Sequence, residues 1–110
     1  MLSLGGTARI FVCKEPTDMR KGFEGLSAEV EILASGELLS GAYFVFLNRQ
    51  RNRMKVLYWD TDGLAIWNKR LEKGSFEQQK DGNPWIDRRE FFMILEGVIP
   101  KRLNNRYKAF

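Results

Sequence analysis

The run Tyr-Phe-Val-Phe-Leu at positions 43–47 restricts most strongly how this chain can fold. In a strand, alternate side chains point to opposite faces, and here both faces are apolar. The run therefore predicts a central strand that is covered on each side by other parts of the protein. A first strand is expected at 8–13, where β-branched and aromatic residues are followed by Pro16.

Three chain reversals follow the central strand and define the rest of the sheet. They lie at the asparagine-containing loop 48–52, at Asp62-Gly63 and at Lys73-Gly74. Asparagine tolerates positive φ, and Asp-Gly is a strong signal for a tight hairpin turn. The segments between these turns have strand composition, strongly at 53–59 and 64–71 and more weakly at 75–79. We therefore expect an antiparallel β-meander at the centre of the fold.

Two amphipathic helices are expected beside this sheet. Thr17 or Asp18 is a suitable N-cap for the first helix. The apolar residues of this helix recur at helical spacing. They are predicted to form one buried stripe that consists of Met19, Phe23, Leu26, Val30 and Leu33.

The second helix is predicted from Asp87 and Glu90, whose spacing is typical of a capping box. Its apolar stripe consists of Phe91, Ile94, Leu95 and Val98, and Pro100 should end it. The last residues, 101–110, form a basic tail with too few apolar side chains to predict a packed element. We therefore expect an α+β fold and a single domain over residues 1–110, with an antiparallel β-meander of four to five strands and two flanking helices.

The composition excludes several classes of catalytic site. Histidine is absent, which removes Cys/His zinc sites, Ser-His-Asp triads and every histidine general base. The single cysteine, Cys13, lies in an apolar segment and is expected to be a buried, unreactive thiol. No apolar run approaches ~18 residues, and no export signal is recognisable, so a cytoplasmic protein is expected.

Asp60 and Asp62 form the one close carboxylate pair that suggests a metal site. Two carboxylates could hold Mg²⁺ for phosphoryl transfer. Aspartate is also favoured at both positions of a hairpin turn, and no third acid is clearly placed beside the pair, so the turn is the preferred interpretation. Because nucleotide-binding glycine loops are missing as well, the sequence predicts no enzyme, no cofactor and no metal site.

An alternating row of cations is the main functional feature of the sequence. Arg49, Arg51, Arg53 and Lys55 occupy every second position from the loop 48–52 into the 53–59 strand, and the chain carries a net charge of +4. The hairpin tip is expected to lie outside the core. Three interpretations remain open for it: solvated decoration, a phosphate clamp for nucleic acid, or a docking surface for an acidic protein. The candidate nucleic-acid-binding residues are Arg49, Arg51, Arg53, Lys55, Lys69, Arg70, Lys101 and Arg102.

Tyr58 and Trp59 could in principle stack on bases. Neighbouring strand residues point to opposite faces, however, so at least one of these rings must fill the core. Core packing is also expected for Trp67 and Trp85.

Three motifs resemble a known family. They are PTDMRKGFEGL at 16–26, FVFLNRQRNRMKVLYWDTDGLAIWNKRLEKGSF at 44–76 and ILEGV at 94–98. In this order and spacing they resemble the small accessory protein, commonly labelled TnpB, that is encoded by the second reading frame of bacterial IS-sixty-six-type insertion sequences. This family is distinct from the RNA-guided nuclease that shares the label.

The resemblance implies participation in transposition beside a separate, larger transposase that cuts and joins the DNA. It supplies no active site. It favours contact of the basic hairpin with DNA, at the insertion-sequence ends or non-specifically, or with a transposase–DNA complex. The alternative is an adaptor that binds the transposase without touching DNA, and the sequence does not discriminate between the two.

Overall fold

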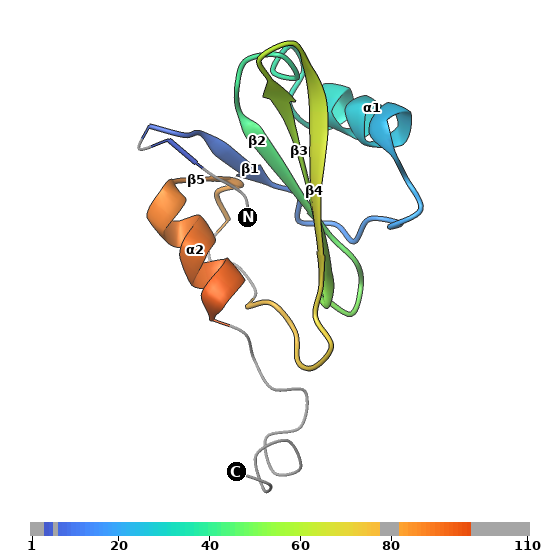
Figure 1. Cartoon of the computed structure of the whole chain (residues 1–110), viewed down its shortest axis with the longest axis vertical. Coiled ribbons are helices and arrows are strands. Elements are labelled where there is room, and N and C mark those ends of the chain that lie inside the picture. Colours follow the sequence, from blue (N-terminus) through green and yellow to red (C-terminus); the bar gives the residue numbers. More distant parts are fainter. Residues whose placement is uncertain (1–3, 6, 78–81, 98–110) are drawn as a thin grey trace, which may run out of the picture.

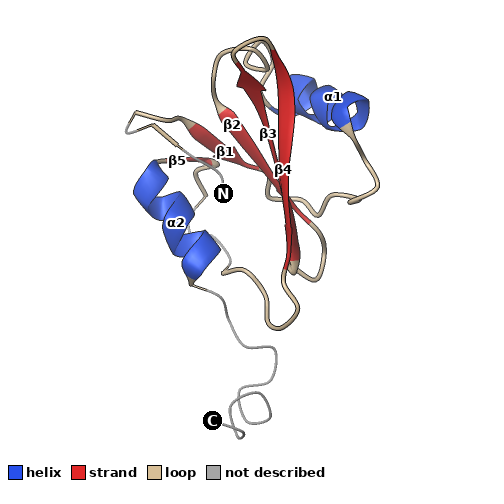
Figure 2. Ribbon diagram, in the orientation of Figure 1, coloured by secondary structure: helices blue, strands red, loops and turns tan. Residues whose placement is uncertain are grey.

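The computed structural model describes residues 4–5, 7–77 and 82–97 of the chain. Within these residues a five-stranded sheet lies between two helices (Figure 1, Figure 2). The elements are β1 (Ile10–Val12), α1 (Phe23–Leu33), β2 (Tyr43–Leu47), β3 (Arg53–Asp60), β4 (Gly63–Arg70), β5 (Trp85–Ile86) and α2 (Arg88–Glu96). The predicted α+β class, with mostly antiparallel strands and two flanking helices, is confirmed.

The meander predicted from the turn signals is formed by β2, β3 and β4. Both strand pairs are antiparallel, with Phe44 opposite Leu57 in the first and Leu57 opposite Ile66 in the second. β2 lies in the middle of the sheet order β4-β3-β2-β1-β5, and its four residues 44–47 are buried. The prediction of a central strand covered on both sides is therefore confirmed.

The strand predicted at 75–79 is not present in the described residues of that segment. Ser75 forms only an isolated bridge, and residues 78–79 lie outside the described residues. Phe76 instead anchors the chain to the hairpin tip, because its backbone N–H donates to the carbonyl oxygen of Arg51 at 2.7 Å. Its side chain is buried in the core.

The sheet also contains one parallel pair, which the turn signals did not predict. β1 runs parallel to β2, with Phe11 opposite Phe44, and α1 forms the crossover between the two strands. On its other side β1 pairs antiparallel with β5, where Phe11 lies opposite Trp85. β5 has only two residues, too few to produce a periodic pattern in the sequence.

Each face of the sheet packs on one helix. The face toward α1 contributes Phe11, Phe44, Phe46 and Leu57, which pack with Leu26 and Val30. The face toward α2 contributes Ile10, Val12, Val45, Met54 and Val56, which pack with Phe91, Ile94 and Leu95. The alternation of β3 side chains between two faces follows the sequence pattern.

The first helix begins later than predicted. Its N-cap is Gly22, with no side-chain cap. Thr17 is buried and donates its backbone N–H to Leu47 at 2.8 Å, which extends the pairing beyond β1. Asp18 accepts the backbone N–H of Arg20 at 2.9 Å and so stabilises a turn before the helix.

The stripe predicted for this helix is only partly buried. Met19, Leu26 and Val30 are in the core, whereas Phe23 is 50% exposed and Leu33 is 39% exposed. Phe23 and Leu33 are the first and last residues of α1, at the two ends of the stripe, and only its middle residues Leu26 and Val30 are buried within the helix. The prediction that Phe23 and Leu33 belong to the core is therefore wrong.

The second helix begins as predicted. Asp87 is the N-cap and accepts the Glu90 N–H at 2.8 Å, and the reciprocal bond completes a capping box. Phe91, Ile94 and Leu95 are buried. Val98, Pro100 and the tail at 101–110 lie outside the described residues. Neither described helix is long and apolar enough to cross a membrane.

Candidate functional site

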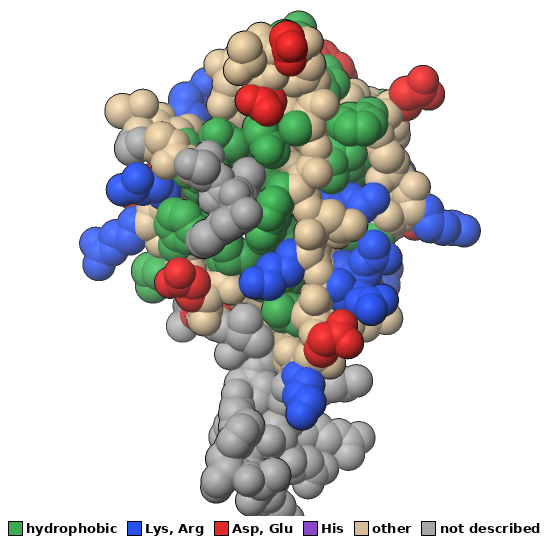
Figure 3. Space-filling model, in the orientation of Figure 1, with side chains coloured by type: hydrophobic (Ala, Val, Ile, Leu, Met, Phe, Trp, Pro, Cys, Tyr) green, Lys and Arg blue, Asp and Glu red, His purple; other side chains and the backbone are tan. Residues whose placement is uncertain are grey.

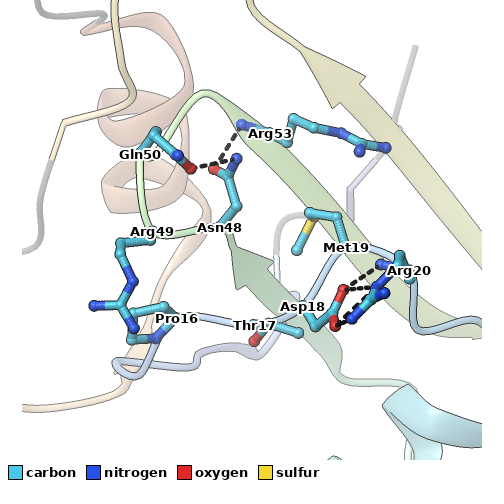
Figure 4. Close-up of a pocket in the computed structure, with 9 residues that line it drawn as sticks. All are labelled: Pro16, Thr17, Asp18, Met19, Arg20, Asn48, Arg49, Gln50 and Arg53. Carbon is cyan, nitrogen blue, oxygen red and sulfur yellow. Dashed lines mark hydrogen bonds and ion pairs between the residues drawn. The ribbon is translucent and has the colours of Figure 1, made fainter.

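The hairpin tip between β2 and β3 is organised by the side chain of Asn48. Its Oδ1 atom accepts the backbone N–H groups of Asn52 and Arg53, both at 3.0 Å. Its Nδ2 atom donates to Asn52 Oδ1 at 2.7 Å and, at 3.4 Å, to Gln50 Oε1 (Figure 4). Asn48 thereby replaces the glycine-based turn that is common in hairpins and leaves Arg51 in the left-handed region, with φ of 58°.

Arg51 is a structural cation and not an exposed one. Its Nε atom donates to the carbonyl oxygen of Phe76 at 3.2 Å, and its Nη2 atom donates to that of Glu77 at 2.7 Å. Burial lowers the pKa of this guanidinium, which stays ionised at neutral pH. The expectation that the tip lies wholly outside the core is therefore wrong for Arg51.

Lys55 is also bound within the protein. It lies on the face of the sheet toward α1, opposite Phe46, and its Nζ atom donates to the carbonyl oxygen of Lys21 at 2.9 Å. Lys21 in turn pairs with Glu29 at 2.6 Å. Lys55 thus connects β3 to the chain just before α1.

Arg53 and Arg70 are paired directly across β3 and β4. Like charges in directly opposite positions destabilise a sheet. Glu72 offsets this repulsion weakly, since its contact with Arg70 is 3.3 Å long and both side chains are well exposed. The register therefore concentrates positive charge at one end of the sheet.

Arg49 and Lys69 add to this charge. Both are exposed, and neither side chain makes a hydrogen bond or an ion pair with another residue in the described part of the chain. Lys69 lies opposite Met54, so it is on the face toward α2, whereas Arg53 and Arg70 are on the face toward α1. We call Arg49, Arg53, Lys69 and Arg70 the basic end of the sheet.

The other end of the β3–β4 hairpin, at the turn that connects the two strands, is acidic. Asp60 and Asp62 flank Thr61, which has a φ of 56°, in the turn between β3 and β4. Arg53 and Asp60 are separated along β3 by roughly 23 Å at ~3.3 Å per residue. Figure 3 shows Lys and Arg side chains gathered over the lower part of β3 and β4 and acidic side chains at the top of the view.

The turn geometry accounts for Asp60 and Asp62 as a hairpin feature. Among the residues that the structure describes, no group of three or more acidic, cysteine or histidine residues could hold a metal ion. Cys13 is buried, and burial raises the pKa of its thiol.

A groove of about 550 Å³ opens beside the basic end (Figure 4). Its lining comes from the turn before α1 and from the hairpin tip, and consists of Pro16, Thr17, Asp18, Met19, Arg20, Asn48, Arg49, Gln50 and Arg53. We call it the arginine groove. Sequence reasoning missed the contribution of the first segment, because it considered Thr17 and Asp18 only as N-caps of a helix.

Three arginines line the arginine groove, and they differ in their partners. The Arg20 guanidinium forms a two-pronged ion pair with Asp18, with contacts of 2.7 to 3.1 Å, and these bonds hold the pKa of Asp18 well below its usual range. Arg49 lines the groove together with Pro16. The Nε atom of Arg53 is buried and has no hydrogen-bond partner among the described residues.

The aromatic residues near the sheet divide as the alternation predicts. Tyr58 packs on Tyr43, with ring centroids 5.0 Å apart, against the core toward α2. Trp59 is 37% exposed at the acidic end of β3. Trp67 is half-buried against the core toward α2, and Trp85 meets Phe11 edge-on on the other face.

Fold and surface together define a small basic α+β protein with a cationic groove at one end of its sheet. A family model described as IS66 Orf2-like protein matches residues 8–105, and the chain belongs to this family. Membership associates the chain with transposition in an accessory role and confirms the resemblance found in its motifs. The family is not known as catalytic.

Two similar proteins come from Sinorhizobium fredii (strain NBRC 101917 / NGR234). The uncharacterized protein y4jC is 34% identical over 100 residues, which cover 89% of this chain and 86% of y4jC. The uncharacterized protein y4hO is 36% identical over 76 residues, which cover 69% of this chain and 66% of y4hO. No solved structure matches the chain.

Proposed function

We propose that this chain is a non-catalytic accessory protein of DNA transposition whose basic end contacts DNA directly, either alone or within a transposase–DNA complex. The pairing of Arg53 with Arg70 carries the proposal. Two like charges held opposite each other repel, and a phosphate beside them relieves that repulsion. Because Arg49 adds a third cation in the groove that Arg53 also lines, the surface suits a polyanion better than a single acidic side chain.

The candidate residues contribute unequally to this proposal. Arg51 and Lys55 have their hydrogen bonds inside the protein, so they supply charge to the surface and not contacts. Lys69 is exposed on the other face of the sheet, so it can contact only DNA that extends past the end of the sheet to that face. Lys101 and Arg102 lie outside the described residues and remain candidates from the sequence.

The partners follow from the chemistry of this surface. Arginine contacts to phosphates position a protein on DNA and carry no direct sequence information. We therefore expect binding to insertion-sequence ends and to unrelated duplexes with similar affinity. Selectivity for the element would then come from the transposase that acts beside this chain.

A second candidate function is an adaptor that binds the transposase without touching DNA. It is favoured by large apolar side chains that α1 and the following loop leave in contact with water. Ile32 is 79% exposed, Leu39 is 61% exposed and Phe23 is 50% exposed. Exposed apolar side chains of this size are available to a protein partner, although Phe23 and Ile32, nine residues apart on α1, point to opposite sides of the helix.

A titration separates the two functions. The isolated protein is added to a fluorescein-labelled duplex of about 20 base pairs at about 50 mM salt, with and without the transposase of the element. Direct contact predicts binding by the isolated protein that weakens as salt increases. No binding by the isolated protein at this salt concentration, together with capture of the transposase by the protein, would instead establish the adaptor.

A further inference from the structure

β4 is a long edge strand that lacks the features by which proteins protect such edges. It ends the sheet order β4-β3-β2-β1-β5, and its eight residues pair with β3 without a bulge. Edges are normally protected by short strands, proline, bulges or charges. The other edge, β5, has only two residues. β4 contains no proline, and its only charges, Lys69 and Arg70, lie at one end, so residues 63–67 form an unprotected apolar edge.

The hydrogen bonds between β3 and β4 show which backbone groups this edge presents. The ladder continues to Leu71, whose N–H donates to the carbonyl oxygen of Asn52 at 2.7 Å. In an antiparallel pair alternate residues bond the neighbouring strand, so the odd-numbered residues of β4 bond β3. The even-numbered residues direct their N–H and C=O groups outward, with no backbone partner among the described residues: Leu64, Ile66, Asn68 and Arg70. In Figure 1 no other described element is drawn across β4.

Opposite charges at the two ends of β4 indicate which strand fits this edge. Asp62 directly precedes β4, and Arg70 is its last residue. A second copy in antiparallel orientation therefore brings the basic end of each chain beside the acidic turn of the other. Two-fold symmetry requires one residue to lie opposite its own copy.

The choice of that central residue fixes the register. With Ile66 opposite itself, Arg70 lies opposite Asp62 of the second copy at both ends of the pairing. With Trp67 opposite itself, Arg70 would lie opposite the apolar Leu64 and would gain no ion pair. Opposite charges in directly opposed positions stabilise a sheet, so the register centred on Ile66 is favoured.

We infer that β4 pairs antiparallel with β4 of a second copy of this chain, about a two-fold axis at Ile66. The outward groups of Leu64, Ile66 and Asn68 then form about six hydrogen bonds between the copies. The pairing also covers part of the half-buried Trp67, which lies opposite Ala65 of the second copy. Arg70 has several donors, so it binds Asp62 of the second copy and still donates to a phosphate. The inference is therefore independent of the proposed function.

Charge reversal tests the register in the absence of DNA. Sedimentation equilibrium of the parent should give twice the mass of one 12.8 kDa chain. Asp62→Lys and Arg70→Glu should each raise the dissociation constant of the dimer at least roughly tenfold, because each places like charges at both ends of the pairing. An equimolar mixture of the two variants should dimerise like the parent, since lysine then meets glutamate and Arg70 meets Asp62. The matched control is Arg88→Glu, an exposed charge on α2, with an expected change of no more than about twofold.

Two outcomes of sedimentation would overturn the inference. The first is a parent protein that keeps the mass of one chain up to about 500 μM. The second is a parent dimer in which neither charge reversal acts more strongly than Arg88→Glu, because the copies would then meet at another surface. The proposed function stands in both cases, since its own titration measures DNA binding.

Amide hydrogen exchange tests the same pairing in the unmodified protein. The N–H of Ile66 should exchange slowly when the protein is dimeric and rapidly after dilution to single chains, because only the second copy supplies its acceptor. The N–H of Trp67 faces β3 and should stay protected at both concentrations. Rapid exchange at Ile66 in a dimeric sample would refute the pairing even if a charge-reversal variant failed to fold.

Discussion

Arg51 gives the sharpest test of how this fold uses its cations. Arg51→Ala removes two hydrogen bonds from a charged donor to the carbonyl oxygens of Phe76 and Glu77, at 3.2 and 2.7 Å. Hydrogen bonds of this kind contribute about 1.5–3 kcal/mol each. The site is only partly buried, so water can reach the freed carbonyls, and we expect a total loss of about 2 kcal/mol in the free energy of unfolding.

Two control variants isolate the cause of that loss. Arg49→Ala removes an exposed arginine of the same loop and should change the free energy of unfolding by less than about 0.5 kcal/mol. Arg51→Gly loses the same hydrogen bonds but relieves the strain of a φ of 58°, so it should be more stable than Arg51→Ala. The difference between the two Arg51 variants is expected to be about 1 kcal/mol.

Urea unfolding followed by circular dichroism measures these differences. At an m-value of about 2 kcal/mol per M, a loss of 2 kcal/mol lowers the midpoint by about 1 M without changing the slope. An Arg51→Ala midpoint no lower than that of Arg49→Ala would refute the structural role of Arg51. The alternating cations would then form a single exposed row, as the sequence pattern suggested.

Three further predictions concern α1, the turn before it and the acidic turn. Phe23→Ala should lower the free energy of unfolding by less than about 1 kcal/mol, and Leu26→Ala should lower it by about 3 kcal/mol, because only Leu26 is fully buried. Equal losses of the two variants in urea unfolding would contradict this difference. Asp18 has its pKa held below its ordinary value of 3.8, so its ion pair contributes stability above that pH and loses it as pH falls further. Asp18→Asn should therefore flatten the acid side of a stability–pH curve, by a small amount because Asp18 is exposed, and parallel curves for the two proteins would argue against the pair. The isolated protein should cleave no insertion-sequence DNA in Mg²⁺ or Mn²⁺, and metal-dependent cleavage that Asp60→Asn abolishes would overturn the accessory role.

The sequence was informative wherever a local pattern decides the structure. The apolar run at 43–47 and the Asp62-Gly63 turn predicted the centre of the sheet, since alternation and turn chemistry act within a few residues. The capping box of Asp87 and Glu90 was equally local. These elements needed no knowledge of distant contacts.

The errors at α1 arose because a local capping signal competed with long-range pairing to the sheet. Thr17 and Asp18 are good N-caps, yet Thr17 is held by β2 through Leu47, and Asp18 stabilises a turn instead. Long-range pairing with the sheet therefore delays the helix to Phe23. Helical periodicity assigned Phe23 to the core, although it is the first residue of α1 and half exposed.

The candidate site was predictable in charge but not in detail. Strand alternation predicts that Arg53 and Lys55 share one face, and both were candidates from the sequence together with Arg70. It did not reveal that Arg51 and Lys55 donate to carbonyl groups 25 and 34 residues away. The arginine groove was hidden for the same reason, since its two walls meet only through the tertiary fold.

The dependence of DNA binding on salt tests the central claim most directly. Each phosphate contact contributes about −0.9 to the slope of log K against log salt on duplex DNA. Arg49, Arg53 and Arg70 replaced together by glutamine should therefore flatten that slope by roughly 2 to 3 and weaken binding to insertion-sequence ends and random duplexes alike. A parent protein with the same slope as this triple variant would contradict the assignment of the basic end to phosphate contacts.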